Sequence, residues 1–302
     1  MNKNFIATWS FAPYFKKENT KWSDEKYLWA ATIASLESVY EHYGTKVKVY
    51  TDSVGMEIFP MLTDKVELIN VHDNVYDGVT EGLWAWAKLE TYKMQNEPYV
   101  HIDLDFILKR RLPEEFFGGD LGGQVRELTD RPIPGHEQHG REIWYLVYNL
   151  PVVGMDFDLP NLYMKPLINT YYPLNVGVLC MNNMEVNKKY VDTVFEFMDN
   201  NRIAMNDAYE HGGKNAIIDI AVLEQQTLGI LINDMELDCR TLLPDGDMTN
   251  GIQSEDFITF CGEGFKTNKG LFQEIREKHL DKYCDDKVQL VLNRLNEMKK
   301  DM

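Results

Sequence analysis

The sequence has few cysteines and no long apolar run, and each absence excludes a class of protein. Its four cysteines, Cys180, Cys239, Cys261 and Cys284, lie far apart and form no Cys-x-x-Cys pair. This spacing argues against a zinc site and predicts reduced thiols in a cytoplasmic protein. No apolar stretch approaches the ~20 residues that cross a bilayer, so we expect no membrane span. The apolar run at residues 5–9 is too short for a signal peptide.

Basic residues are scarce as well. The chain has 31 lysines and arginines against 48 aspartates and glutamates, which gives a formal net charge of −17. Without a broad basic surface a protein cannot displace the counterions of nucleic acid, so we expect no binding to nucleic acid or to anionic membranes. This charge still allows a local basic pocket that binds a phosphate.

The residues that are present indicate a globular protein with a substantial core. Hydrophobic residues make up 44% of the 302 residues, and aromatic residues make up 12%. This composition excludes a disordered chain. The length allows one large domain, or one domain with an appended helical segment.

Strand-like and helix-like patterns alternate in the first third of the chain. Strands are predicted at residues 5–10, 46–52, 66–70 and 99–108, and helices at residues 27–43, 55–62 and 84–95. Gly44 lies where the C-terminal cap of a helix is expected. A regular alternation of this kind predicts a parallel sheet with crossover helices.

The later part of the chain is less regular. Glycines and prolines interrupt residues 113–151, which we expect to form an irregular insertion. The pattern then predicts a strand and two helices, at residues 175–183, 186–198 and 215–231. From residue 271 it becomes that of amphipathic helices. We therefore expect one α/β domain at residues 1–270 and a helical tail at residues 271–302.

Two carboxylates belong to the strand predicted at residues 99–108. In an extended chain Asp103 and Asp105 point to the same side, where their charges repel unless a cation lies between them. Hard oxygen ligands suit Mg²⁺ or Mn²⁺, which complete their octahedra with waters and phosphate oxygens. The alternative is a pair of ordinary carboxylates that face water. Asp-x-Asp also occurs at residues 156–158 and 245–247, so the pattern alone has low specificity.

Short patterns in chain order carry a resemblance to a known family. They are Trp86-Ala87-Lys88-Leu89, His101-Ile102-Asp103-Leu104-Asp105, Asn175-Val176-Gly177 and Glu224-Gln225-Gln226-Thr227-Leu228. They look like a lysine-bearing helix, an Asp-x-Asp strand end, an Asn-x-Gly strand and an acidic-Gln-x-x-Leu helix. The set resembles the nucleotide-sugar glycosyltransferases of the GT-A fold, nearest to the retaining family of glycogenin-like and galactosyltransferase-like enzymes.

The resemblance covers about residues 5–270 and implies a fold and an activity. The fold would be α/β and Rossmann-like, with a mostly parallel central sheet flanked by helices. The activity would be transfer of a sugar from a nucleotide-diphosphate donor, with a UDP-sugar as the expected partner. Asp103 and Asp105 would bind Mn²⁺ or Mg²⁺, which stabilises the leaving diphosphate.

The resemblance also assigns residues to the two sides of the donor. The residues expected to bind its nucleotide side are Thr8, Trp9, Ser10, Asp52, Lys88 and Lys266. Asn175 and Gly177 are expected to line the sugar and acceptor side, while Glu224 and Gln225 would lie near the anomeric carbon. Of these two, Gln225 is the better candidate to support a short-lived oxocarbenium ion. Three assignments have an alternative: Trp9 in the core, Lys88 in a surface ion pair, and Lys266 exposed in a turn.

The chain departs from the family in its C-terminal loop. The family often has His-x-x-Gly-x-x-Lys there, whereas this sequence has Cys261-Gly262-Glu263-Gly264-Phe265-Lys266. The missing histidine leaves the third metal ligand open. A carboxylate from Glu263 suits Mn²⁺ or Mg²⁺, and a thiolate from Cys261 does not.

Two other interpretations stay open. The missing histidine favours a catalytically degraded GT-A-like protein that binds a nucleotide or a protein partner, and the intact Asp103 and Asp105 argue against it. A nucleotidyltransferase shares the sheet and its metal carboxylates. That class usually has a glycine-rich loop after the first strand, and residues 9–14 contain no glycine. The fold does not identify the sugar or the acceptor.

Overall fold

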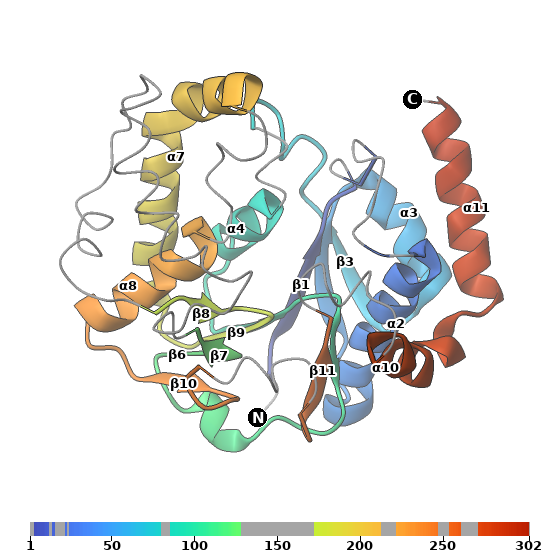
Figure 1. Cartoon of the computed structure of the whole chain (residues 1–302), viewed down its shortest axis with the longest axis horizontal. Coiled ribbons are helices and arrows are strands. Elements are labelled where there is room, and N and C mark those ends of the chain that lie inside the picture. Colours follow the sequence, from blue (N-terminus) through green and yellow to red (C-terminus); the bar gives the residue numbers. More distant parts are fainter. Residues whose placement is uncertain are drawn as a thin grey trace. The chain divides into compact units, whose positions relative to one another are not determined.

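The computed structural model describes residues 3–11, 14–15, 22, 24–79, 85–127, 172–212, 222–246, 254–260 and 271–301. The chain forms two compact units. The first unit comprises Met1–Asn74, Tyr99–Leu112 and Thr249–Met302, and the second comprises Val75–Pro98 and Pro113–Met248. Each unit contains both strands and helices (Figure 1).

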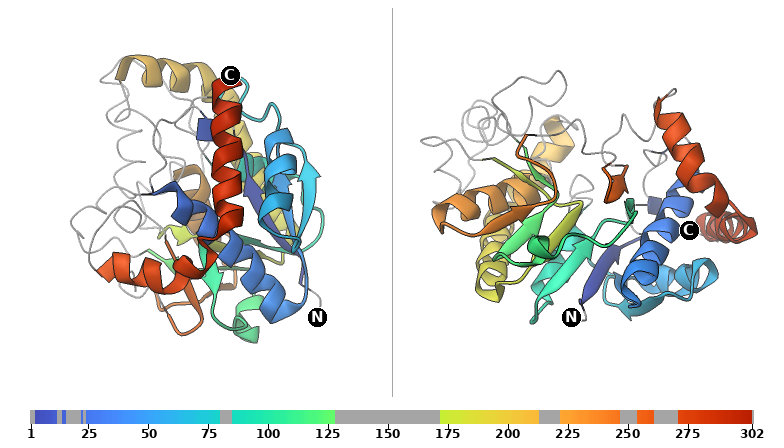
Figure 2. Two further views of the ribbon diagram at one scale, coloured as in Figure 1. Left: turned by 90° about the vertical axis from the view of Figure 1, so that its right-hand side faces the viewer. Right: turned by 90° about the horizontal axis from the view of Figure 1, so that it is seen from below.

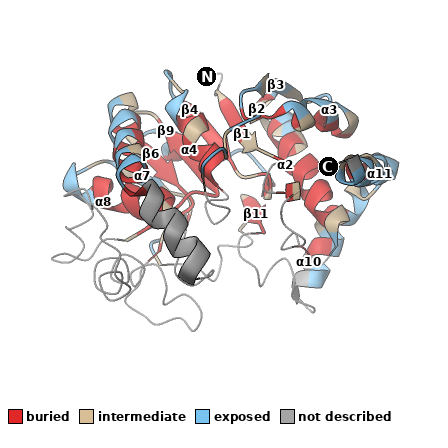
Figure 3. Cartoon of the chain, turned by 90° about the horizontal axis from the view of Figure 1, so that it is seen from above, coloured by how far each residue is buried: buried red, intermediate tan, exposed pale blue. Residues whose placement is uncertain are grey.

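Parallel strands form the centre of the first unit. The strands β4, β1, β2 and β3 lie side by side in that order, and each neighbouring pair is parallel (Figure 3). Their bounds are β1 Phe5–Trp9, β2 Val47–Thr51, β3 Val66–Asn70 and β4 Tyr99–Ile102. All four residues of β4 are buried, as expected for a strand of a parallel sheet that is covered on both faces. The predicted parallel sheet with crossover helices is confirmed.

The helix α2, Glu25–Tyr43, connects β1 to β2 and is capped at both ends. Its N-terminal cap is Asp24, whose carboxylate accepts a hydrogen bond from the Lys26 N–H at 3.0 Å. It ends at Gly44, which has a φ of 68° and donates its N–H to the Tyr40 carbonyl. Most of the helix is buried (Figure 3). The next crossover helix, α3, spans Ser53–Leu62.

The segment predicted as one strand at residues 99–108 is two strands. The strand β4 ends at Ile102 and β5 spans Phe106–Leu108, with a turn between them. The turn forms because the Phe106 N–H donates to the Asp103 carbonyl at 2.9 Å. The strand β5 then pairs antiparallel with β11, Phe257–Thr259. The expectation that one extended strand carries both aspartates is therefore wrong.

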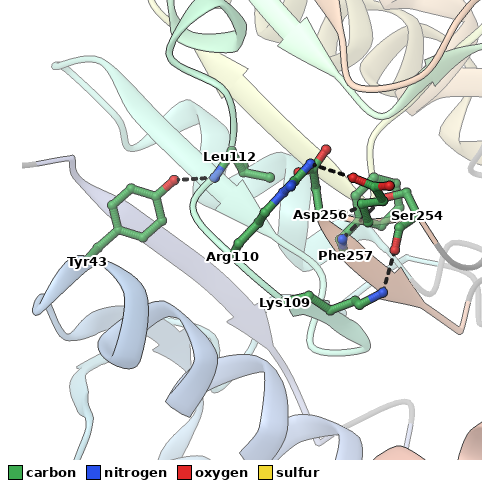
Figure 4. Close-up of polar contacts among 8 residues, drawn as sticks. Tyr43, Lys109, Arg110, Leu112, Ser254, Asp256 and Phe257 are labelled. Carbon is green, nitrogen blue, oxygen red and sulfur yellow. Dashed lines mark hydrogen bonds and ion pairs between the residues drawn. The ribbon is translucent and has the colours of Figure 1, made fainter.

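The residues that follow β5 are bonded to two other segments (Figure 4). Lys109 donates its ammonium to the Ser254 carbonyl at 2.7 Å, and Arg110 forms an ion pair with Asp256. The Leu112 N–H donates to the hydroxyl of Tyr43, the last residue of α2, at 2.9 Å. These contacts hold residues 109–112, which follow the turn and β5, in place.

The C-terminal tail packs on the first unit. It consists of α10 Leu271–Leu280, the 3₁₀ turn η6 Asp281–Tyr283 and α11 Asp286–Asp301. The helix α11 contacts α2 and α3 (Figure 2). Its Val288, Val291 and Leu295 are buried, and Lys299 pairs with Glu25 of α2 at 3.5 Å. The predicted helical tail is confirmed, and these three apolar side chains are covered by the chain itself.

A mixed group of short strands belongs to the second unit. The strand β6, Leu121–Gly123, pairs parallel with β10, Cys239–Thr241, and antiparallel with β9, Val178–Met181. A separate antiparallel pair joins β7, Val125–Arg126, to β8, Leu174–Asn175.

Residues 113–127 are the described part of the range that we expected to be irregular. They form the 3₁₀ turn η1, Glu114–Phe117, followed by β6 and β7. The glycines in this range fit close packing and do not mark a loop. A Cβ on Gly122 would lie 2.8 Å from the Phe116 ring, and one on Gly123 would lie 2.6 Å from the Leu174 side chain.

The helices of the second unit pack on one another. They are α4 Trp86–Lys93, α7 Met184–Gly212, the π-helical turn η5 Val222–Gln226 and α8 Thr227–Asp234. The helix α7 contacts both α4 and α8 (Figure 1). Asn187 of α7 donates its amide to the Tyr92 carbonyl of α4 at 3.0 Å.

The predicted fold class is confirmed. The protein is α/β, with mostly parallel strands in the first unit, flanking helices and a C-terminal helix. Within the described ranges, none of the helices has the length and apolar character needed to span a bilayer. Cys180, Cys239 and Cys284 are free thiols.

Replacement of Gly44 tests the cap of α2. Gly44→Ala is expected to lower the free energy of unfolding by about 1 kcal/mol, because an L side chain is strained in the left-handed region. No atom lies within 4 Å of the added Cβ, so the cost is backbone strain alone. Urea denaturation measures the loss. The control is Gly118→Ala, at a helix end with a φ of −92°; equal losses in the two variants would contradict the assignment.

Candidate functional site

The C-terminal ends of the parallel strands bring several predicted site residues to one edge of the first unit. Ser10 follows β1, Asp52 follows β2 and Asp103 follows β4. Because β1 lies between β2 and β4 and all three are parallel, these residues leave the sheet at the same edge. This edge is where open α/β sheets bind their ligands.

The turn after β4 holds the backbone of both aspartates. The Asp103 carbonyl accepts hydrogen bonds from the Phe106 N–H at 2.9 Å and from the Ser35 hydroxyl at 3.2 Å. The Asp105 carbonyl accepts one from the Phe260 N–H at 3.1 Å. Both side chains are partly exposed, and that of Asp103 is 32% exposed. The backbone is therefore fixed while the carboxylates remain accessible.

The two carboxylates suit a hard divalent cation. Mg²⁺ and Mn²⁺ prefer oxygen ligands and usually keep waters or ligand phosphate oxygens beside one or two carboxylates. Among the described residues, no group of three His, Cys, Asp or Glu side chains could hold a metal ion. Asp103 and Asp105 supply two carboxylates of the kind that such an ion prefers. The expected third ligand, Glu263, and the phosphate-binding Lys266 lie outside the described residues.

His101 links the first strand to Asp103. Its ring is 1% exposed, and its Nε2 lies 3.2 Å from the Thr8 hydroxyl. Its Nδ1 lies 3.9 Å from an Asp103 carboxylate oxygen. We assigned no role to His101 from the sequence, because it occupies one position of an apolar strand. The sequence signal that could have identified it is its position two residues before Asp103.

Both carboxylate oxygens of Asp52 accept hydrogen bonds from other residues of the protein. One oxygen accepts the Gly55 N–H at 3.0 Å and so caps α3. The other accepts the Ser10 hydroxyl at 3.0 Å and the Phe11 N–H at 2.6 Å. With an exposed fraction of 5%, Asp52 orders the loop after β1. Its expected contact with a nucleoside stays a prediction.

Trp9 belongs to an aromatic cluster at the end of β1. Its ring packs edge-on against Trp29 at 5.6 Å and against Phe11 at 5.9 Å between centroids. Phe11 stacks on Trp29, and Tyr14 packs edge-on against both. Burial, followed by the charge of Glu25, raises the pKa of Tyr14 above its usual range. Trp9 as a whole residue remains partly exposed, although its ring nitrogen is buried.

The Asn-x-Gly pattern forms a closed turn in the second unit. Asn175 is buried, donates its amide to Glu127 at 3.0 Å and accepts the Gly177 N–H at 3.1 Å. A Cβ on Gly177 would lie 2.6 Å from the Gln124 side-chain oxygen, so a larger residue there would displace the end of the Gln124 side chain. Glu127, itself buried, is a polar residue that we did not single out from the sequence. It follows a glycine-rich stretch that we read as irregular.

Lys88 and Glu224 form a buried ion pair. The Lys88 ammonium lies 2.7 Å from a Glu224 oxygen, with side chains 9% and 4% exposed. The Tyr92 hydroxyl donates to the same oxygen at 3.3 Å, and the Tyr190 hydroxyl donates to the Glu224 backbone carbonyl at 3.2 Å. The pair joins α4 to η5. Lys88 therefore does not form the surface ion pair that was one of its expected roles, and the two tyrosines are contacts that the sequence pattern did not reveal.

Gln225 occupies the middle of the π-helical turn beside this pair. Such turns occur frequently at functional sites, because the extra residue changes the direction of a side chain. Gln225 is partly exposed, whereas Glu224 is buried. Its side-chain oxygen is buried and accepts no hydrogen bond from the part of the chain that the structure describes. Among the described residues, the Gln225 oxygen thus lacks the contacts that engage the Glu224 carboxylate.

Comparison with known proteins gives a family and several structural likenesses. The model of a family of unknown function (DUF6734) matches residues 5–298. No curated protein matches the chain.

Solved glycosyltransferases are similar in structure at low identity. The galactosyltransferase LgtC, in complex with donor and acceptor sugar analogues, is 12% identical, with 65% of each chain covered and a TM-score of 0.35. Mouse xyloside xylosyltransferase 1 is 14% identical, with 76% of this chain and 84% of that chain covered and a TM-score of 0.35. The glycosyltransferase GlyE of Streptococcus pneumoniae TIGR4 is 13% identical, with 97% and 63% covered and a TM-score of 0.44.

These structural similarities are weak, and two of them cover only part of the matched protein. The chain spans less than two thirds of the length of LgtC and of GlyE, at 65% and 63%. At identities of 12–14% and TM-scores below 0.5 they carry no argument about activity.

The buried ion pair predicts an asymmetric mutational effect. Lys88→Met is expected to lower the free energy of unfolding by about 3 kcal/mol, because it leaves the Glu224 carboxylate without its buried counter-charge. The double variant Lys88→Met/Glu224→Gln is expected to regain most of this loss, since the substituted amide is neutral and can still accept the Tyr92 hydroxyl. Urea denaturation of both variants measures the difference. A double variant less stable than Lys88→Met would contradict the assignment.

Proposed function

We propose that this chain, which belongs to the family of unknown function DUF6734, is a metal-dependent glycosyltransferase. The reaction would move a sugar from a nucleotide-diphosphate donor, with UDP as the expected nucleotide, to an acceptor. The proposal rests on the residues of this chain and on the resemblance of its short patterns to the GT-A enzymes.

One observation carries the proposal. Asp103 and Asp105 lie in a turn whose backbone is hydrogen-bonded on both sides, at the carboxyl edge of a parallel sheet, with accessible side chains. Ordinary surface carboxylates need no such support. Two partly exposed carboxylates at a ligand-binding edge suit a cation that is shared with a phosphate ligand.

The divalent ion would supply positive charge for a leaving diphosphate, which avoids any need to protonate it. We assign Asp103 and Asp105 as its ligands and Glu263 as the candidate third ligand. Lys266 is the candidate cation for a donor phosphate. Thr8, Trp9 and Ser10, at the end of β1, are the candidates for contact with the base and ribose. Asp52 would act on the nucleoside by ordering Ser10 and Phe11, both of which donate a hydrogen bond to its carboxylate.

On the sugar side, the contacts in the second unit distinguish between two neighbours. The Glu224 carboxylate is engaged by Lys88 and Tyr92, whereas the Gln225 side-chain oxygen has no hydrogen-bond partner among the described residues. We therefore assign Gln225 to the anomeric carbon, where an amide oxygen can support developing positive charge. Glu224 would hold the π-helical turn in place. Asn175 and Gly177 would line the acceptor side.

A catalytically degraded GT-A-like protein is the second candidate. The observation that favours it is the lack of a three-ligand metal cluster among the described residues. Such a protein would bind a nucleotide or a protein partner without transfer. The two candidates differ in the need for a metal ion.

Substitution of the aspartates tests the proposal. Wild-type protein is expected to bind UDP or a UDP-sugar only when Mn²⁺ is present. Asp103→Asn and Asp105→Asn are each expected to lose this binding, because a neutral amide is a much weaker ligand for a hard cation. Isothermal titration calorimetry with a panel of nucleotides and nucleotide sugars measures the affinity, and circular dichroism checks the fold.

The matched control is Asp64→Asn, which removes a carboxylate that is 81% exposed in the same unit. It should bind like the wild type. Unchanged UDP affinity with Mn²⁺ in both aspartate variants would refute the metal site. Nucleotide binding by the wild type without any metal would favour the second candidate.

A further inference from the structure

Two buried serines of α2 hold the segment that carries the aspartates. The Ser35 hydroxyl, on a residue that is 0% exposed, donates to the Asp103 carbonyl at 3.2 Å. The Ser38 hydroxyl, on a residue that is 4% exposed, accepts the Leu108 N–H at 3.0 Å. Ser38 also donates to the Ser35 carbonyl at 2.7 Å. The two serines thus contact the segment at residues 103–108 near both of its ends.

These hydroxyls differ from a third buried hydroxyl of the same helix. Thr32 is also 0% exposed, but it donates to the Leu28 carbonyl at 3.0 Å, within α2 itself. Serine is not favoured in the interior of a helix, and a buried hydroxyl costs free energy unless it is bonded. Ser35 meets this requirement through the aspartate segment, and Thr32 meets it through its own helix. Ser38 does both, because it accepts from Leu108 and donates to the Ser35 carbonyl of α2.

The bond from Ser35 bears directly on the geometry of the carboxylate pair. The Asp103 carbonyl accepts from both Ser35 and Phe106, so its peptide is oriented from two directions. The Asp105 carbonyl is bonded to Phe260. With both peptides fixed, rotation of the side chains is the main freedom left to the carboxylates. A cation shared by the two carboxylates gains from this order, because less motion is lost when it binds.

We propose that Ser35 is a positioning residue for a divalent cation held by Asp103 and Asp105, an inference that rests on the proposed function. Ser35 does not contact the cation. It acts through the Asp103 peptide, as residues outside the ligand shell do when they orient metal ligands. Ser38 supports the same segment at its other end.

The variant Ser35→Ala tests this role. Alanine is a good helix former, so α2 is expected to persist. The affinity for Mn²⁺ in the presence of UDP is expected to fall about 10-fold or more, the usual effect of removing a residue that orients metal ligands. Without metal or nucleotide, the Phe106 amide is expected to exchange its hydrogen faster, because the turn that it closes has lost a support. Calorimetry and hydrogen exchange with mass spectrometry measure these effects.

The matched control is Thr32→Val, which removes a buried hydroxyl of α2 that has no bond to the aspartate segment. It should leave Mn²⁺ affinity and exchange at Phe106 as in the wild type. Ser38→Ala is a second variant of the same kind as Ser35→Ala. It is expected to speed exchange at Leu108 and to weaken Mn²⁺ binding.

The outcomes separate this inference from the proposed function. If the wild type binds Mn²⁺ and UDP while Ser35→Ala and Ser38→Ala bind them equally well, the positioning role is overturned and the proposed function stands. If the wild type binds neither, the proposed function fails and the inference fails with it. Weaker binding with faster exchange in both serine variants, and no change in Thr32→Val, supports the inference.

Discussion

The hydrogen bonds that hold the turn from Asp103 to Phe106 are the feature on which the candidate site depends. A buried strand followed by two like charges is unfavourable unless the chain leaves the sheet and the charges reach water. The turn achieves this by ending β4 at Ile102 and starting β5, which pairs with β11 instead of the parallel strands. Ser35 and Phe260 then fix the two aspartate carbonyls. The carboxylates are partly exposed, but the backbone that carries them is ordered.

The second unit orders its polar residues in a different way. Lys88 and Glu224 neutralise each other where both are buried, and Tyr92 adds a hydrogen bond to the same carboxylate. A buried pair of this kind contributes little net stability, although removal of one partner is costly. Its effect is to fix the π-helical turn against α4, which leaves Gln225 as the more accessible of the two neighbours. Glu224, the acid of the sequence pattern, is thus bonded within the protein, whereas the side-chain oxygen of Gln225 has no hydrogen bond among the described residues.

Much of the fold followed from the sequence, because local patterns and caps agreed. Gly44 ended α2 as predicted, and the strands at residues 47–51 and 66–70 matched the apolar alternation. The break after Ile102 could not be predicted from residues 99–108, since it depends on pairing with β11, which is distant in sequence. Gly122 and Gly123 were read as loop residues, yet they fit close packing against Phe116 and Leu174.

At the candidate site, the sequence indicated which residue types to expect, but it did not show which residues contact one another. Asp103 and Asp105 stood out because charge is rare in an apolar strand. The hydroxyls of Ser35 and Ser38 did not stand out, because a serine inside a helix has no distinctive pattern. Likewise, the contact of Lys88 with Glu224 joins residues far apart in the chain, and only the folded structure brings them together.

The most direct test of the central claim is a crystal grown with Mn²⁺ and UDP, with diffraction recorded at the manganese absorption edge. The account predicts one anomalous peak within coordination distance of the Asp103 and Asp105 carboxylates, shared with the diphosphate oxygens. A peak bound to other residues, or ordered UDP with no manganese beside these aspartates, would contradict it.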